Sequence, residues 1–383
     1  MARQKNRIDE RSQAGRSIFA EKKQTTITMK TIKQWMTALV AAVGGLMVCS
    51  AAAGQDNPSL ECQTFVYAVK GADTLRLDVY RDKKALAKEA KPILLYTHGG
   101  GWESGSRDSD NPKLYSGFVE KGFVVVSIDY RLGYLEARKE GQIPDESITP
   151  HLLNKTLDDS ARIAAIKRGM REGVEDLYDA TSYVVKHARQ WNANPKQIIL
   201  AGSSAGACIS LQAEYLRCKE DVLSRTHLPG KFSYAGVVSG SGALWDFDGN
   251  GVDFVRKPCP IMLFHGEKDQ MVPYSTERFS LTGTTAYGSQ SVADILDRMG
   301  TICWFVSCAD ADHVIAGYPF TACQEEILSF VKRTVTGKEK VSVRSRENMY
   351  ADGRTLMNYL KGEKGLSDED IRALLDQIGV KSL

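Results

Sequence analysis

The chain has 383 residues, of which 43% are hydrophobic and 25% are charged. This composition is typical of globular proteins and excludes a disordered chain, a collagen-like fibre and a multi-span membrane protein. Residues 1–53 hold nine basic and three acidic side chains, which leaves 41 basic and 44 acidic ones in residues 54–383 and a formal charge of −3 there. A slightly acidic body has no electrostatic attraction for a phosphate backbone, so nucleic acid is excluded as a partner.

Residues 29–53 have the pattern of a secretory signal peptide, whose true start we predict at Met29. Lys30 and Lys33 form the positive n-region, residues 36–48 form an apolar run, and the alanines that end at Ala53 offer a cleavage site. The apolar run is shorter than the roughly 20 residues that a transmembrane helix needs. A buried core helix or an N-terminal anchor is the alternative. We therefore predict a leader over residues 1–53, no transmembrane span, and a periplasmic or extracellular location.

The cysteines do not form a metal-binding pattern. Of the eight, Cys49 would be removed with the leader, and the remaining seven are an odd number, so at least one stays unpaired within the chain. No CxxC pair and no zinc-type spacing of Cys and His occurs. A disulfide between Cys308 and Cys323 is conceivable in an oxidising compartment. The pairing is left open by the sequence.

Short apolar runs alternate with longer helical patterns along residues 54–337. Runs of this length without polar alternation are typical of parallel strands that are covered on both faces. The first two strands are expected to form an antiparallel hairpin near Gly71. The pattern predicts a doubly wound α/β domain with a mostly parallel sheet of about eight strands. The predicted strands cover residues 65–69, 74–80, 93–96, 123–128, 198–200, 234–238, 261–264 and 302–306.

Three helices are predicted over residues 174–191, 205–216 and 325–335 from apolar side chains at helical spacing. Residues 132–170 interrupt the alternation with a polar stretch and a further helical piece, which favours a small cap or lid over a site. The charged residues 338–383 are predicted to form a C-terminal helical extension outside the catalytic domain.

A Gly-x-Ser-x-Gly pentapeptide at 202–206 is centred on Ser204. The pentapeptide alone is a weak signal, but it directly follows a predicted strand and directly precedes a predicted helix. This is the setting that a nucleophile elbow requires, in which glycines allow a turn that exposes the serine hydroxyl. A plain tight turn is the alternative interpretation.

The chain resembles the α/β-hydrolase superfamily, and within it the esterase and lipase group that carries an HGGG motif. His-Gly-Gly-Gly-Trp at 98–102 and Asp-Tyr-Arg-Leu at 129–132 match motifs of this group, and the resemblance covers roughly residues 61–335. It implies an oxyanion hole formed by the backbone N–H groups of Gly100, Gly101 and Ala205. A phosphate-binding role for the glycines is disfavoured, because no Gly-Lys-Ser/Thr signature follows them.

A serine nucleophile needs a base and an orienting carboxylate, and the superfamily order is Ser, acid, His. Of the histidines after Ser204, we expect His313 to be the base, His265 to pack at a strand end and His227 to lie in a surface loop. For the carboxylate we expect Asp269, in a segment that matches G-x-x-D-x-x-V-P of the superfamily. The alternatives to Asp269 are Asp310, Asp312 and Glu267.

Weaker signals concern the substrate and a metal. Trp102 and Trp245 flank the expected site in sequence and are candidates for a substrate pocket, with ordinary packing as the alternative. Residues 246–251 resemble the first half of a calcium loop, but Lys257 stands where the last ligand should be a Glu. We therefore predict a polar turn there, and neither a metal nor a cofactor.

These features together predict a secreted serine esterase that forms an acyl-enzyme on Ser204. The resemblance implies small to medium carboxylic esters, and acyl groups on carbohydrate are a further candidate. A prolyl-oligopeptidase-like peptidase and a non-catalytic binding protein are the alternatives. The peptidase lineage usually carries a large propeller domain, whereas fewer than 20 residues separate the predicted leader from the first strand. The oligomeric state is left open.

Overall fold

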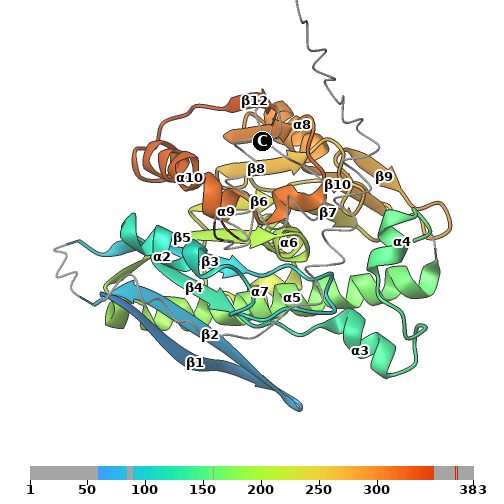
Figure 1. Cartoon of the computed structure of the whole chain (residues 1–383), viewed down its shortest axis with the longest axis horizontal. Helices are drawn as coiled ribbons and strands as arrows, with labels where there is room; N and C mark the ends of the chain where they lie inside the picture. Colours follow the sequence, from blue (N-terminus) through green and yellow to red (C-terminus); the bar gives the residue numbers. More distant parts are fainter. Residues whose placement is uncertain (1–58, 84–88, 158, 349–366, 368, 370–383) are drawn as a thin grey trace, which may run out of the picture. The chain divides into compact units, whose positions relative to one another are not determined.

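The computed structural model describes residues 59–83, 89–157, 159–348, 367 and 369. The predicted leader and most of the predicted C-terminal extension lie outside these residues. The central element is a sheet of nine strands (Figure 1). In order across the sheet, they are β1 (Leu60–Lys70), β2 (Asp73–Asp82), β4 (Val124–Ile128), β3 (Lys91–Thr97), β5 (Ala193–Ser203), β6 (Gly236–Gly240), β8 (Ile261–Gly266), β11 (Cys303–Cys308) and β12 (Val343–Glu347).

The sheet is mixed but mostly parallel. β1 pairs antiparallel with β2, and β2 pairs antiparallel with β4, whereas all pairs from β4 to β12 are parallel. The hairpin between β1 and β2 turns at Gly71, whose φ of 61° is in the left-handed region. The predicted fold class and the antiparallel leading edge are therefore confirmed, with nine strands in place of about eight.

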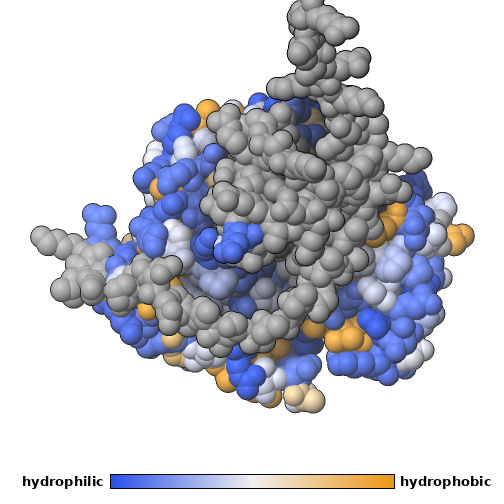
Figure 2. Space-filling view, in the orientation of Figure 1, coloured by the Kyte–Doolittle hydropathy of each residue, from blue (hydrophilic) through white to orange (hydrophobic). Residues whose placement is uncertain are grey.

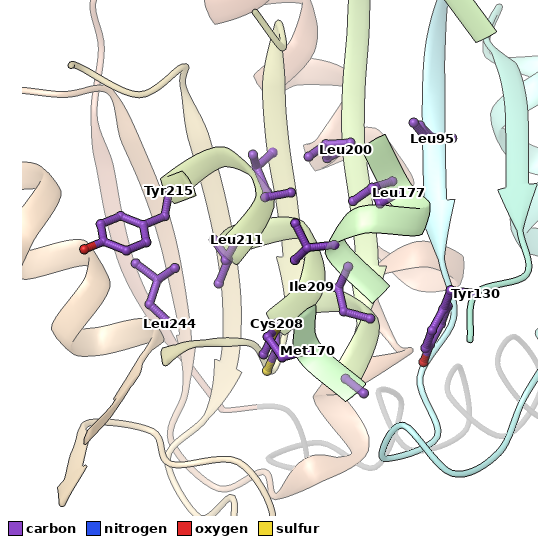
Figure 3. Packing of buried hydrophobic residues seen from close by; sticks show 14 of the residues in the cluster. Leu95, Tyr130, Met170, Leu177, Leu200, Cys208, Ile209, Leu211, Tyr215 and Leu244 are labelled. Carbon is purple, nitrogen blue, oxygen red and sulfur yellow. The ribbon is translucent and has the colours of Figure 1, made fainter. Parts of the chain in front are cut away.

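Successive residues in the central parallel strands are apolar, so both faces of the sheet need cover, and helices lie against both. Ile93 and Leu95 of β3 pack with α5 and α6 on one face (Figure 3), whereas Leu94 and Tyr96 pack with α2 and α10 on the other. The helices are α2 (Pro112–Glu120), α3 (Gly133–Lys139), α4 (Thr149–Leu153), α5 (Ser160–His187), α6 (Ala205–Cys218), α7 (Val222–His227), α8 (Ser289–Arg298), α9 (Pro319–Ala322) and α10 (Gln324–Phe330). Shorter turns are η1 (Ala188–Trp191), η2 (His313–Ala316) and the π-helical η3 (Val331–Thr336).

Helix α5 joins two segments that the sequence pattern kept apart. It is continuous for 28 residues, so the helical piece at the end of the predicted cap and the helix predicted at 174–191 are one element. Two glycines inside it lie under neighbouring side chains. A Cβ on Gly169 would lie 2.7 Å from Trp102, and one on Gly173 would lie 2.5 Å from Ile209. The glycines therefore permit close packing that a larger residue would prevent.

The segment predicted as a cap contains α3, α4 and the start of α5. Across from α4 lies a second, antiparallel sheet of β7 (Ala243–Asp246), β10 (Thr285–Gly288) and β9 (Thr276–Arg278), which the sequence pattern did not predict. Lys155, just after α4, forms an ion pair with Glu277 of β9 at 3.3 Å. This pair links the two elements at the right of Figure 1.

The beginning of the predicted helical extension is a strand, so that part of the prediction is wrong. β12 pairs parallel with β11 over five residues and adds the last strand to the sheet. Arg344 and Arg346 of β12 form ion pairs with Asp297 at the end of α8 and with Glu267 after β8. Charged side chains suit an edge strand, and the pairing with β11 outweighs the polar composition that suggested a helix.

Hydrophilic residues predominate on the described part of the face drawn in Figure 2, and hydrophobic residues form small, separate groups there. Among the residues that the structure describes, no helix combines the length and apolarity that crossing a bilayer requires.

Candidate active site

Ser204 lies in a sharp turn between β5 and α6, at the carboxyl end of the parallel strands. Its φ of 52° and ψ of −119° are an unusual conformation for a residue with a side chain. The Ser204 N–H donates to the carbonyl of Gly240 at the end of β6, which anchors the turn. A Cβ on Gly206 would lie 2.1 Å from the Thr97 carbonyl, so the close approach of β3 requires a glycine at this position.

The structure brings Ser204, His313 and Asp269 together although they lie far apart in the sequence. The Nε2 atom of His313 is 2.8 Å from the Ser204 Oγ, and its Nδ1 atom is 2.8 Å from Oδ2 of Asp269. Because Nδ1 faces a carboxylate, it carries the proton, and Nε2 is then the acceptor for the serine hydroxyl. The three side chains form one continuous line of hydrogen bonds.

Backbone contacts between two loops place the acid beside the histidine. The N–H groups of Glu267 and Lys268, after β8, donate to the carbonyls of Cys308, the last residue of β11, and of Ala311, just after it. Asp269 follows directly, and its side chain is fully buried. Because β8 and β11 are adjacent and parallel, the loops at their carboxyl ends lie side by side.

Two of the carboxylates that were alternatives to Asp269 as the partner of His313 form other contacts. Asp312 accepts the N–H of Val314 and thereby caps the short helix η2, which begins at His313. Glu267 accepts hydrogen bonds from Ser307 and Arg346. Of the three carboxylates, only Asp269 forms a hydrogen bond with the His313 ring among the described residues.

Electrostatics keep Asp269 ionised and make His313 more basic. Burial alone would raise the pKa of the Asp269 carboxyl, but the imidazoles of His313 and His265 outweigh this effect and hold that pKa well below its usual range. Burial alone would lower the pKa of His313. The charge of Asp269 and its hydrogen bond outweigh this effect and raise the pKa of His313 above its ordinary value.

The glycine-rich loop after β3 lies against the serine turn. Gly100 and Gly101 have φ values of 112° and 62°, and a Cβ on Gly100 would lie 2.1 Å from the Ser104 carbonyl. A Cβ on Gly99 would lie 3.3 Å from the Cβ of Ser204, so the backbone of the loop borders the nucleophile position. The loop therefore needs its glycines for conformation and for close approach.

Backbone donors are available beside Ser204. The N–H groups of Gly100 and Gly101 donate to no acceptor among the described residues. The N–H of Ala205, the first residue of α6, has no partner within its helix, as is general for the first turn. The family resemblance implied an oxyanion hole formed by these three groups. Of the three, the Ala205 N–H lies at the start of a helix, where negative charge is favoured.

Trp102 and Trp245 lie next to one another but are largely buried. Their rings meet edge to face with centroids 6.4 Å apart, and Trp245 is also stacked between Phe247 and Phe279. Trp102 directly follows the glycines at 99–101, and Trp245 lines a groove between the predicted cap and the small sheet. The groove is lined by His151, Leu152, Lys155, Leu157, Trp245, Met271, Pro273, Glu277 and Phe279.

A second hollow lies at the opposite edge of the sheet, near the amino ends of β3 and β4. Ligands of open α/β sheets bind outside the carboxyl ends of the strands, where Ser204 lies, so we do not assign this hollow to the site. It is lined by Glu61, Arg81, Asp82, Lys83, Lys91, Val124, Trp191 and Asn192.

The calcium-like turn at 246–251 uses its carboxylates for protein contacts. Asp246 accepts the N–H groups of Asp248 and Gly251, and Asp248 forms an ion pair with Lys167 at 2.7 Å.

The cysteines form no disulfide within the described chain, and both Cys308 and Cys323 are free thiols. Neither the turn nor these two thiols contribute a group to the site around Ser204.

His227 is not in a surface loop as expected, but is the last residue of α7. Its Nδ1 atom is 2.6 Å from a carboxylate oxygen of Asp179, and Glu175 completes a group with metal-ligand spacing. However, the ammonium group of Lys70 is 2.5 Å from Glu175 and 2.6 Å from Asp179. A lysine thus already supplies the positive charge at this place, and the group is an ion-pair network.

His265 contacts the site more closely than the sequence pattern suggested. It packs at the end of β8, as expected, but its Nε2 atom is also 3.3 Å from the same Oδ2 atom of Asp269 that His313 contacts. The spacing of four residues between His265 and Asp269 is visible in the sequence. This spacing alone does not predict the contact, because the turn after β8 is what brings the Asp269 carboxylate back against the His265 ring.

Two family models match the chain. Residues 77–148 match the model BD-FAE, and residues 167–238 match a model described as alpha/beta hydrolase fold. The second match contains β5, the turn at Ser204 and α6, and the strand order of the whole sheet agrees with it. The chain has an α/β-hydrolase fold.

Among the curated relatives of this chain are esterases of low sequence identity. Gut esterase 1 of Caenorhabditis elegans is 26% identical over 171 residues, which are 44% of this chain and 26% of the relative. Carboxylesterase NlhH of Mycobacterium tuberculosis is 26% identical over 125 residues, which are 33% of this chain and 29% of the relative. The matched segments thus span between a quarter and a third of the length of these relatives.

A solved structure of Thermogutta terrifontis esterase 2 phosphoramylated by tabun aligns with 74% of this chain and with 96% of its own chain. The sequence identity is 16% and the TM-score is 0.49. The fold assignment therefore rests on the strand order and the two family matches.

Proposed function

We propose that this α/β hydrolase is a serine esterase that hydrolyses small to medium carboxylic esters. The observation that supports the proposal is the hydrogen-bonded line from Asp269 through His313 to Ser204, next to backbone N–H groups without an acceptor. This arrangement combines an activated nucleophile, a base and donors for an oxyanion. The names of the curated relatives agree with ester hydrolysis.

In the first half of the reaction, the Ser204 Oγ bonds to the ester carbonyl carbon while His313 Nε2 takes the hydroxyl proton. The carbonyl oxygen becomes an oxyanion that accepts hydrogen bonds from the N–H groups of Gly100, Gly101 and Ala205. The tetrahedral intermediate then collapses, the bond to the alcohol oxygen breaks, and His313 returns its proton to that oxygen. The alcohol leaves, and an acyl-Ser204 ester remains.

In the second half, His313 removes a proton from water, and the water oxygen attacks the acyl carbonyl. The same backbone donors hold the second oxyanion, and collapse of the intermediate breaks the bond to Ser204 Oγ, which regains its proton from His313. The carboxylic acid leaves. Asp269 remains ionised in both halves and fixes the tautomer and orientation of the imidazole.

We propose that the ester class includes acyl groups carried on carbohydrate. The groove beside Trp245 combines an apolar wall with the partly exposed ion pair of Lys155 and Glu277. Charged side chains at the groove suit a hydroxyl-rich alcohol, but the free volume of the groove, about 10 Å³, is too small for an acyl chain or ring. Export, which we propose from the signal-like pattern of residues 29–53, would bring the enzyme to extracellular carbohydrate. N-terminal sequencing of secreted protein that retains residues 29–53 would contradict cleavage of this leader.

A substrate panel tests the proposed function. p-Nitrophenyl esters of increasing acyl length, an acetylated sugar, an aromatic acyl sugar and a proline p-nitroanilide are assayed with the same preparation, together with a fluorophosphonate probe. We expect hydrolysis of the short esters and covalent labelling by the probe. Selective cleavage of the anilide would indicate a peptidase, and the absence of both turnover and labelling would indicate a binding protein. Either result would overturn the proposal.

The pH dependence of hydrolysis follows from the raised pKa of His313. Protonated His313 cannot accept the proton of Ser204, so kcat/KM is lost as the pH falls through the pKa of the free enzyme. Because Asp269 raises this pKa above its ordinary value of 6.5, we expect the acid limb to have its midpoint above pH 6.5. Initial rates at low substrate concentration across pH 5–9, with enzyme integrity checked at each pH, measure the limb. A midpoint below pH 6 would contradict the expected effect of Asp269.

A further inference from the structure

Four nitrogen atoms lie within 3.3 Å of the Asp269 carboxylate oxygens. Its Oδ1 atom accepts the backbone N–H groups of Met271 and Val272, each at 2.9 Å. Its Oδ2 atom is 2.8 Å from Nδ1 of His313 and 3.3 Å from Nε2 of His265. The mechanism described above uses only one of the two imidazoles that meet at Oδ2.

Contacts from α8 and from residues 272–274 hold the His265 ring, which is fully buried near the end of β8. Its Nδ1 atom is 2.8 Å from the hydroxyl of Ser289, the first residue of α8, and this hydroxyl is also 3.2 Å from the carbonyl of Gly242. On the other side, Nε2 is 3.2 Å from the carbonyl of Val272, and the ring of Tyr274 packs edge to face at 5.6 Å. The ring therefore has a defined orientation.

The partners of His265 determine where its proton lies. Both atoms near Nε2, the Val272 carbonyl oxygen and Oδ2 of Asp269, are acceptors, so Nε2 must carry a hydrogen. Nδ1 faces a hydroxyl that can donate or accept. A histidine in this state can donate to the carboxylate, with its hydrogen shared between two acceptors.

Among the titratable groups around His265 and Asp269, the negative charge that faces His265 is that of Asp269. Tyr274 is neutral, because burial raises its pKa above the ordinary value. Burial also raises the pKa of Cys208, which lies near Asp269, to about 12. The remaining groups are His313 and, on its far side, Asp312, which adds a negative charge near the His313 ring. A change in the group that donates to Asp269 therefore changes the electrostatic effect of Asp269 on His313.

We propose that His265 is a positioning residue for the catalytic acid: its Nε2–H group holds Oδ2 of Asp269 in the orientation that receives His313. This inference rests on the proposed function. By donating to Oδ2, His265 also withdraws part of the negative charge that His313 would otherwise experience. Loss of this donor leaves the carboxylate free to turn and increases its effect on the basicity of His313.

A matched pair of variants tests the role. In His265→Gln the side-chain amide nitrogen can take the place of Nε2, whereas in His265→Asn the shorter amide can take only the place of Nδ1. We expect His265→Asn to lower kcat by about 10-fold to 100-fold, which is the usual effect of losing a hydrogen bond to a charged group. KM should stay within about twofold, and the acid limb of kcat/KM should move to higher pH. His265→Gln should restore most of kcat and the wild-type acid limb.

Ser289→Ala is the control for packing alone, because it removes the partner of Nδ1 and leaves Nε2 and Asp269 unchanged. We expect its kcat to exceed that of His265→Asn and its acid limb to match the wild type. Thermal unfolding of all variants is measured in parallel. If His265→Gln and His265→Asn lose the same activity and neither moves the acid limb, His265 only fills space and the proposal is wrong.

A measurement on the wild-type protein does not depend on whether the variants fold. Nitrogen-15 NMR of the histidine rings reports which ring nitrogen carries hydrogen, and we expect a hydrogen on Nε2 of His265. A bare Nε2 would overturn the proposal, because it could not donate to Asp269. Inactive wild-type enzyme, or full activity in Ser204→Ala, would overturn the proposed function and this inference with it. Active wild type with indistinguishable His265 variants would overturn the inference alone.

Discussion

Replacement of Ser204 by alanine is expected to lower kcat for p-nitrophenyl acetate by about 10⁴-fold to 10⁶-fold and to abolish fluorophosphonate labelling. The variant removes the only oxygen that lies within hydrogen-bond distance of Nε2 of His313 among the described residues. The backbone donors remain, so a small residual rate above the uncatalysed reaction is expected. Steady-state kinetics with a titrated active-site concentration measure the loss.

The adjacent serine is the matched control. Ser203 belongs to the same Gly-Ser-Ser-Ala-Gly turn, but its hydroxyl accepts a hydrogen bond from the phenol of Tyr96 at 3.2 Å. We expect Ser203→Ala to retain kcat within about fivefold, because only one neutral hydrogen bond is lost. Equal losses in the two variants would show that the turn, rather than the Ser204 hydroxyl, is required. Retained labelling in Ser204→Ala would identify a different nucleophile.

Asp269→Asn is expected to lower kcat by about 10³-fold to 10⁴-fold without unfolding the protein. The reason lies in the donors around the side chain. Met271 and Val272 present N–H groups to Oδ1, so the amide oxygen takes that place and the NH₂ group turns toward His313. The amide then donates to Nδ1, the imidazole carries its proton on Nε2, and it can no longer accept the proton of Ser204. Pre-steady-state acylation rates and thermal unfolding separate this effect from a loss of structure.

Asp312→Asn is the control for charge. It also removes a negative charge beside His313, but the carboxylate of Asp312 caps η2, and asparagine is an equally good cap. We expect kcat within about tenfold of the wild type and an acid limb at slightly lower pH, because Asp312 contributes to the raised pKa of His313. If the two variants lost activity equally, negative charge near His313 would be the requirement, and the orienting role of Asp269 would be refuted.

Local sequence signals were sufficient for the parts of the fold whose cause is local. The parallel strands are short runs without polar alternation, and burial on both faces demands this composition wherever the strand lies. The turn at Ser204 could likewise be predicted, because the tight approach of β3 and α6 requires glycine on both sides of the serine. The HGGG motif after β3 could be predicted for the same reason, because its glycines allow a close approach of the backbone.

Features that depend on a distant partner could not be predicted in the same way. Residues 343–347 are polar and charged, and they form a strand because β11 offers an unpaired edge. The strands β7, β9 and β10 are three or four residues long and become a sheet only through one another. Short segments of this kind carry too little local preference to determine their own conformation.

The residue types of the candidate site were thus apparent from the sequence, as a serine in a glycine turn followed by an acid and several histidines. The sequence pattern favoured His313 as the base, whereas the tertiary structure decided the distances within the site and the contact of a second histidine with the same carboxylate. His313 lies 109 positions from Ser204, and the two approach because β5, β6, β8 and β11 are neighbours whose carboxyl ends share one edge of the sheet. A linear pattern specifies which chemical groups are present, whereas the distances that make them act together arise only when the strands pair.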